Sequence, residues 1–209
     1  MARLLYIETS PRKDRSASIE AARTFLTEYQ KTHPQDVVET LDLWNTPLPE
    51  FEGEVINAKY AILHGLKHTD PQRHAWSAVE KIISHFTSAD QYVFSLPMWN
   101  FGVPYKLKHY IDVLTQPGYT FSFTPGEGYK GLVTGKPVAV IYARGGSYPP
   151  GTGAASFDLQ KAYMELILGF IGFKGIRSVI VEPTLSSPEQ TEKARAAARE
   201  LAKEMAATF

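Results

Sequence analysis

The chain has 209 residues, 44% of them hydrophobic, and its 22 basic and 22 acidic residues balance to a formal net charge of zero. This length suffices for one domain with a full core, and the charge balance excludes a general electrostatic attraction to nucleic acid or to an anionic membrane. Cysteine is absent, which excludes disulfides and iron–sulfur ligation, and no apolar run approaches the ~20 residues of a membrane span, so we expect a cytoplasmic protein.

The first half of the chain alternates strand-like and helix-like segments. Apolar strands are predicted at residues 2–8, 36–41 and 92–96. From Ser18 onward apolar side chains recur at helical spacing, and Ser16 or Ser18 is the expected cap of that helix. Residues 42–49 form a connection with Trp and Pro that is too irregular for a helix. Residues 54–88 predict two helices, the second capped by Asp70.

The second half continues the alternation. Its predicted segments are a helix at 105–114, a hairpin or lid at 119–135, a strand at 137–143, a helix at 157–171, a strand at 176–181 and a helix at 188–207. The apolar stripe of the helix at 157–171 is wide enough to predict burial on more than one side. Five strands with crossover helices predict an α/β fold of the flavodoxin-like type, as a single domain over residues 1–209. This is a three-layer fold whose parallel sheet has the order 2-1-3-4-5, with helices on both faces.

The loop after the first predicted strand carries groups suited to a phosphate. Ser10, Ser16 and Ser18 place hydroxyls beside the N-terminus of a helix, where free backbone amides and the helix dipole favour an anion. The loop has neither the glycine pattern of a dinucleotide fold nor the lysine of a nucleoside triphosphate loop. The same serines are also expected if one of them only caps the helix and the loop binds no ligand. A phosphate site at this loop therefore needs evidence from other parts of the sequence.

The loop at residues 97–104 is harder to explain as plain structure. It places Met98, Trp99 and Phe101 between a buried strand and a helix, and exposed apolar groups of this size need a partner. Met98 and Trp99 suit one face of a flat heterocycle, and Asn100 suits its polar edge. The loop therefore predicts a site for a planar ring.

A third loop, Arg144-Gly145-Gly146, follows the strand predicted at 137–143. Its glycines expose backbone amides that can donate to the carbonyl end of a ring system, although an ordinary glycine turn has the same composition. Ligands of open parallel sheets bind in the crevice beyond the carboxyl ends of the strands. The three loops together therefore predict one site for a phosphorylated planar ring.

At these residues the chain resembles the FMN-dependent NADH-azoreductase family, a branch of the flavodoxin-like NAD(P)H:quinone oxidoreductases. The resemblance covers essentially the whole chain. The matching motifs are Ser10 with Ser16-Ala17-Ser18, Pro97-Met98-Trp99-Asn100-Phe101, and Ala143-Arg144-Gly145-Gly146, of which the second is the most specific. The chain departs from the family pattern at Trp99, where Tyr is common, and at Ala17 and Ala143, where polar residues occur.

The resemblance implies that the residues of these motifs hold FMN tightly but without a covalent bond. It implies NADH or NADPH as electron donor and quinones or azo compounds as acceptors, in a ping-pong cycle of two-electron hydride transfer. The flavin would carry the chemistry, so no side chain is expected to be a catalytic acid or base. The family also implies a homodimer with a substrate pocket at Phe121, Phe123 and Phe170.

Two alternatives use the same fold. A non-enzymatic flavodoxin-like electron carrier would usually present an acidic docking face, whereas this chain is neutral. An FAD-using quinone reductase would need room for an adenosine limb beyond the first loop. His64 and His68 have i,i+4 spacing but lack both the Glu of a zinc protease helix and an evident third ligand, so no metal site is predicted.

Overall fold

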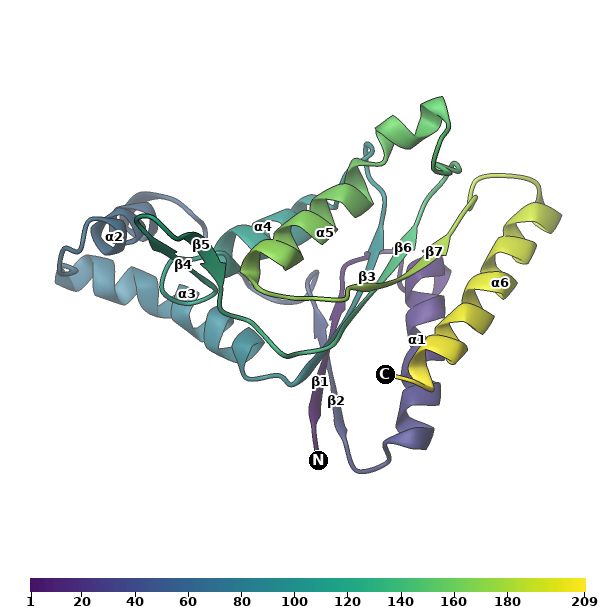
Figure 1. Ribbon diagram of the computed structural model, residues 1–209, viewed down its shortest axis with the longest axis horizontal. Coiled ribbons are helices and arrows are strands. Elements are labelled where there is room, and N and C mark those ends of the chain that lie inside the picture. The colour runs from purple at the N-terminus through teal and green to yellow at the C-terminus, as the bar shows by residue number, and fades with distance from the viewer.

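Five parallel strands form the central sheet, in the order β2-β1-β3-β6-β7 (Figure 1). The computed structural model describes residues 1–209. The strands of the sheet are β1 (Arg3–Glu8), β2 (Val37–Asp42), β3 (Gln91–Pro97), β6 (Val138–Ala143) and β7 (Arg177–Val181). The predicted order 2-1-3-4-5 is confirmed, because β4 (Phe121–Thr124) and β5 (Gly128–Gly131) form a separate antiparallel hairpin.

Helices cover both faces of this sheet (Figure 1). The helices are α1 (Ala17–Thr32), α2 (Gly53–Leu63), α3 (Asp70–Thr87), α4 (Tyr105–Leu114), α5 (Leu159–Ile171) and α6 (Pro188–Ala206), with short 3₁₀ turns η1 (Lys13–Arg15) and η2 (Gly153–Phe157). Strand side chains alternate between two cores, because Leu4 and Tyr6 pack with α1 and α6 while Leu5 and Ile7 pack with α3, α4 and α5. None of the helices has the length and apolar content needed to cross a membrane.

The helix caps follow local chemistry, with one correction to the prediction. Ser16 caps α1, and its side chain accepts from the amide of Ile19. At α3 the cap is Thr69 rather than Asp70, because Thr69 and Gln72 form a reciprocal capping box that moves Asp70 inside the first turn. The boundary predicted from the Thr-Asp-Pro sequence was therefore one residue too late.

The helix α5 presents an apolar face to solvent. The segment predicted as one helix from 157 divides at Asp158, where η2 ends and α5 begins. The inward stripe includes Met164 and Leu168, whereas Leu159 is 58% exposed and Leu166 is 72% exposed. The prediction of burial on more than one side is wrong for the single chain, because no element of this chain covers the outer face.

The hairpin packs against the C-terminal end of α5. The amide of Val133 donates to the carbonyl of Ile171 at 2.8 Å. A Cβ added at Gly131 would lie 2.3 Å from the backbone nitrogen of Gly172. Two backbones therefore meet here with no space for a side chain.

We predict that Gly131→Ala lowers the free energy of unfolding by about 2–3 kcal/mol, because the backbone of one element must move. Gly153→Ala is the matched control, since a Cβ there meets nothing within 4 Å and its φ is not positive. Urea denaturation of both variants measures the difference. Equal stability of the two variants would contradict the close approach.

Candidate functional site

The three predicted loops begin side by side because β1, β3 and β6 are neighbours in register. The amide of Thr9 donates to the carbonyl of Ser95 at 3.1 Å, which joins the ends of β1 and β3. The amide of Met98 donates to the carbonyl of Ala143 at 2.7 Å, which joins the ends of β3 and β6, and Pro97 pairs with Ala143. The sheet therefore brings the phosphate, ring and glycine loops predicted from the sequence to one edge.

The first loop buries its hydroxyls at the start of α1. Ser10, Ser16 and Ser18 are all buried, as is Ala17 at the first helical position. The hydroxyls of Ser16 and Ser18 lie 3.1 Å apart. The amides of the first helical turn have no partner within an α-helix, and the helix dipole favours an anion there. Ser16 is thus both a cap and a member of a donor set that fits a phosphate.

The middle loop is a tight turn that presents its polar and aromatic groups outward. Trp99 and Gly102 exchange backbone hydrogen bonds of 3.1 and 2.9 Å. Asn100 and Phe101 between them have φ values of 48° and 67°, a left-handed conformation that is uncommon outside glycine and is concentrated at functional sites. Phe101 is half exposed, and its ring centroid lies 5.3 Å from that of Phe157 in η2. The turn therefore offers an amide side chain and two aromatic rings at the sheet edge.

Trp44 links the first loop to the middle loop. Its indole Nε1 donates to the carbonyl of Thr9 at 2.8 Å, and its ring centroid lies 5.8 Å from that of Trp99 and 5.4 Å from that of Tyr105. From the sequence, Trp44 is expected in an irregular connection at the mouth of the pocket, with no specific contact assigned to it. Its hydrogen bond joins residues 35 apart in the chain, and no local pattern signals such a contact.

Arg144 of the third loop is an internal anchor. Its side chain is only 1% exposed, and its guanidinium lies 2.7 Å from Asp158 Oδ2 and 3.3 Å from Glu182 Oε2. The Nε donates to Gln160 Oε1 at 3.2 Å. The Arg144 guanidinium is thus paired with Asp158 and Gln160 at the start of α5 and with Glu182 in the segment after β7. We expect Arg144 to shape the loop while its neighbours face a ligand.

The segment after β7 runs close beside the third loop and is hydrogen-bonded to it. The amide of Leu185 donates to the carbonyl of Gly145 at 3.1 Å, and the amide of Thr184 donates to the carbonyl of Arg144 at 2.8 Å. A Cβ at Gly145 would lie 2.8 Å from the side chain of Leu185. Leu185 is 80% exposed, so its side chain can turn away and this contact does not by itself require glycine at position 145; Gly146 next to it is exposed.

The residues predicted for the substrate pocket lie elsewhere in the chain. Phe121 and Phe170 have ring centroids 4.9 Å apart, and Tyr129 lies within 5.0 Å of Phe123 and 5.5 Å of Phe170. This cluster packs at the C-terminal end of α5, whereas Asp158 at the other end contacts Arg144. A helix of 13 residues is about 20 Å long, so one chain does not bring the aromatic cluster to the three loops.

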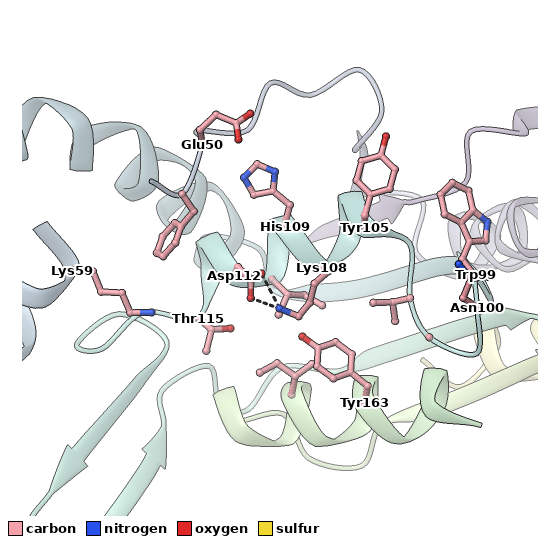
Figure 2. A pocket seen from close by; sticks show the side chains of 15 residues that line it. Glu50, Lys59, Trp99, Asn100, Tyr105, Lys108, His109, Asp112, Thr115 and Tyr163 are labelled. Atoms are coloured by element: carbon pink, nitrogen blue, oxygen red, sulfur yellow. Dashed lines mark hydrogen bonds and ion pairs between the residues drawn. The ribbon is translucent and has the colours of Figure 1, made fainter. Parts of the chain in front are cut away.

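A large open groove runs from the middle loop along α4 and α5 (Figure 2). Its volume is about 1000 Å³, and Trp99 and Asn100 form one end. Figure 2 shows Lys59 and Tyr163 reaching into it from opposite sides, with Lys108 bonded to Asp112 between them at 2.7 Å. The groove shares Trp99 and Asn100 with the predicted site but includes none of its serines and neither Gly145 nor Gly146, so the two overlap only at the middle loop.

No cluster in the chain has the make-up of a metal site. No group of three or more His, Cys, Asp or Glu side chains is placed to hold an ion. His68 is instead engaged with the carbonyl of Ala58, 3.0 Å from its Nε2.

In the groove described above, burial lowers the pKa of Lys59.

Comparison with known proteins places this geometry in a family. A family model described as flavodoxin-like fold matches residues 2–205. The chain is 51% identical to FMN-dependent NADH:quinone oxidoreductase of Desulfotalea psychrophila and 49% identical to the protein of that name from Nitratidesulfovibrio vulgaris. The first match covers 98% of both chains, and the second covers 100% of both.

Solved structures show the same fold. An azoreductase from Bacillus anthracis superposes with a TM-score of 0.91 at 32% identity over 100% of both chains. An FMN-dependent NADH-azoreductase from the same species, solved in complex with FMN, has a TM-score of 0.84 at 26% identity, covering 99% of this chain and 100% of that one. The chain therefore belongs to the flavodoxin-like family, in the branch whose members are named FMN-dependent NADH:quinone oxidoreductase.

We predict that Arg144→Met lowers the free energy of unfolding by about 3–5 kcal/mol, because it leaves Asp158 and Glu182 without their buried partner. Arg73→Met removes the exposed pair with Asp70 and is expected to cost less than about 1 kcal/mol. Chemical denaturation of both variants tests this. Similar stabilities for the two would show that the Arg144 cluster does not hold the loop.

Proposed function

We propose that this chain is an FMN-dependent NADH:quinone oxidoreductase that also reduces azo compounds. The observation that carries the proposal is the convergence of three loops with complementary chemistry at one sheet edge. They provide a buried hydroxyl cradle at a helix N-terminus, an aromatic turn and a glycine turn. The names and high identity of the relatives agree with this assignment.

The donor set fits FMN part by part. Hydroxyls and amides suit a phosphate because they can donate without a fixed charge of their own. The residues proposed for the phosphate are Ser10, Ser16, Ala17 and Ser18. Those proposed for the ring are Pro97, Met98, Trp99, Asn100 and Phe101 on one side and Ala143, Arg144, Gly145 and Gly146 at the carbonyl end. Arg144 would contribute through its backbone, since its side chain is committed to Asp158 and Glu182.

When bound, FMN would supply the hydride chemistry that links oxidation of NADH or NADPH to reduction of a quinone or an azo compound. The residues of the chain position the reactants and shape the electrostatics. Backbone amides at Gly145 and Gly146 would stabilise negative charge at the carbonyl end of the ring. Trp44, Trp99 and Tyr105 pack against one another at one side of the site. Donor and acceptor would occupy the same open face in turn, so a ping-pong cycle follows.

A carrier without enzymatic activity is the alternative for the same fold. The chain has no net charge with which to dock an electron-transfer partner, and its middle loop exposes aromatic rings beside an open groove. These features favour small planar reactants over a protein partner. The relatives named above are oxidoreductases, which supports the enzyme.

We predict that the FMN-loaded protein is bleached rapidly by NADH in an anaerobic stopped-flow experiment and recovers its flavin absorbance on mixing with benzoquinone or an azo dye. Repeating the first step with NADPH measures the donor preference. Mass determination of the extracted flavin distinguishes FMN from FAD. Tight FMN binding without reduction by either nucleotide would favour the carrier over the enzyme.

We propose further that the working unit is a homodimer of one-domain chains in the cytoplasm. Phe121, Phe123 and Phe170 lie a helix length from the three loops of their own chain. The outward face of α5 exposes Leu159 and Leu166 to solvent, and exposed apolar surface of this kind needs a partner. A second copy packed on this face would bring its hairpin to the loops of the first and complete the substrate pocket.

We predict that Leu166→Glu converts the dimer to a monomer and lowers quinone reduction at least tenfold, because it places a charge in the apolar interface. Leu201→Glu on α6 is the matched control, since Leu201 is also half exposed but lies on the opposite helical layer. Light scattering after size exclusion and steady-state turnover measure the two effects. A dimeric Leu166→Glu variant would contradict this placement of the interface.

A further inference from the structure

Lys13 in the first loop is held between two carboxylates. Its Nζ lies 2.6 Å from Glu8 Oε1 and 2.5 Å from Asp42 Oδ2. Glu8 and Asp42 are paired residues at the ends of the neighbouring strands β1 and β2. Burial alone would lower the pKa of Lys13, but hydrogen bonds to Asp42 and Glu8 outweigh it and raise that pKa. The ammonium therefore stays charged and bridges two strand ends.

Lys13 offsets the electrostatic repulsion that the carboxylates of Glu8 and Asp42 would otherwise exert. The side chain of Glu8 is 9% exposed and directly precedes Thr9 and Ser10, where the phosphate cradle begins. Without a cation, Glu8 and Asp42 would repel each other and a phosphate bound at the cradle. Lys13 neutralises one of the two charges and shares its hydrogen bonds between them.

The backbone of Lys13 also shapes the cradle. Lys13 has a φ of 48°, a left-handed conformation that a residue with a side chain keeps only when its surroundings enforce it. The carbonyl of Lys13 accepts a hydrogen bond of 2.9 Å from the amide of Ser16, the cap of α1. The ion cluster thus fixes the residue that orients the serine hydroxyls.

The same cluster reaches the aromatic side of the site. Asp42 accepts from the amide of Trp44 at 3.1 Å, and the indole of Trp44 donates to the carbonyl of Thr9 at 2.8 Å. Lys13 and the amides of the turn hold the pKa of Asp42 below its usual range even though burial works against them. One ammonium therefore connects the first loop to the tryptophan that packs on Trp99.

We propose that Lys13 is a positioning residue for phosphate binding, which acts by neutralising Glu8 and Asp42 and by fixing the loop that carries Ser16, without contacting the phosphate itself. This inference rests on the proposed function, because it takes the first loop as the site of the FMN phosphate. Preference for a phosphorylated flavin would then depend on Lys13, whose ammonium is already paired with Glu8 and Asp42 of the same chain.

The test compares the dissociation constants of FMN and riboflavin, measured by quenching of flavin fluorescence in the apoprotein. Riboflavin lacks the phosphate and so reports on the ring site alone. Lys13→Met is expected to weaken FMN binding about 30-fold and riboflavin binding less than about 3-fold, because two unpaired carboxylates then face the phosphate. Lys13→Arg is expected to restore FMN binding, since a guanidinium can bridge both carboxylates.

Matched variants separate charge from folding. Lys31→Met removes another lysine paired to a glutamate at 2.7 Å on the exposed part of α1 and is expected to change neither constant. The double variant Glu8→Gln with Lys13→Met is expected to recover FMN binding to within about 5-fold of the wild type, because removing one carboxylate together with the ammonium restores the net charge of the wild-type cluster and leaves only Asp42 ionised. Glu8→Gln alone keeps Lys13 on Asp42, so FMN is expected to bind about 3-fold tighter at unchanged riboflavin affinity, which keeps the test valid if Lys13→Met does not fold.

Equal weakening of FMN and riboflavin by Lys13→Met, no change in either, or unchanged FMN binding in Glu8→Gln would overturn the role of Lys13. A wild-type protein that binds riboflavin as tightly as FMN would instead remove the phosphate site from the first loop. That result would refute the proposed cofactor placement and this inference together, and so it is distinguishable from failure of the inference alone.

Discussion

The site depends on the parallel register of β1, β3 and β6. Two backbone hydrogen bonds, from Thr9 to Ser95 and from Met98 to Ala143, join the three strand ends before any side chain takes part. Since parallel neighbours must end at the same edge, strand ends that lie 86 residues apart (Thr9 and Ser95) and 45 residues apart (Met98 and Ala143) become a single surface. Changes within any one loop therefore alter the shape of the site without disturbing its assembly.

Two charge clusters then set the conformation of the loops, one around the buried Arg144 and one around the partly exposed Lys13. Arg144 is held by Asp158 and Glu182 on one side of the site, and Lys13 is held by Glu8 and Asp42 on the other. In both clusters the cation is paired with protein carboxylates, so neither the Arg144 nor the Lys13 side chain is free to pair with a ligand.

Hydrophobic runs were sufficient to predict the strands and the three loops, because each run is short, apolar and bounded by turn residues. The strand order came from the simplest doubly wound arrangement of five strands with crossover helices. The errors came from interactions between distant parts of the chain. Neither the hydrogen bond from Trp44 to Thr9 nor the ion pairs of Arg144 with Asp158 and Glu182 has a local sequence signal. The outer face of α5 was predicted to be buried because periodicity reports apolar character without naming the partner.

The sequence pattern also did not show where the aromatic hairpin lies. Phe121 and Phe123 alternate as a strand pattern requires, yet the distance from the loops depends on the length and direction of α5. A pocket shared between two chains is consistent with both facts.

Hydrogen exchange of the backbone amides with and without FMN tests the central claim most directly. The account predicts that FMN protects three separated segments together, at residues 10–18, 98–102 and 144–146. Protection confined to the large groove, at residues 50–59 and 108–115, with the serine and glycine loops unchanged, would contradict it.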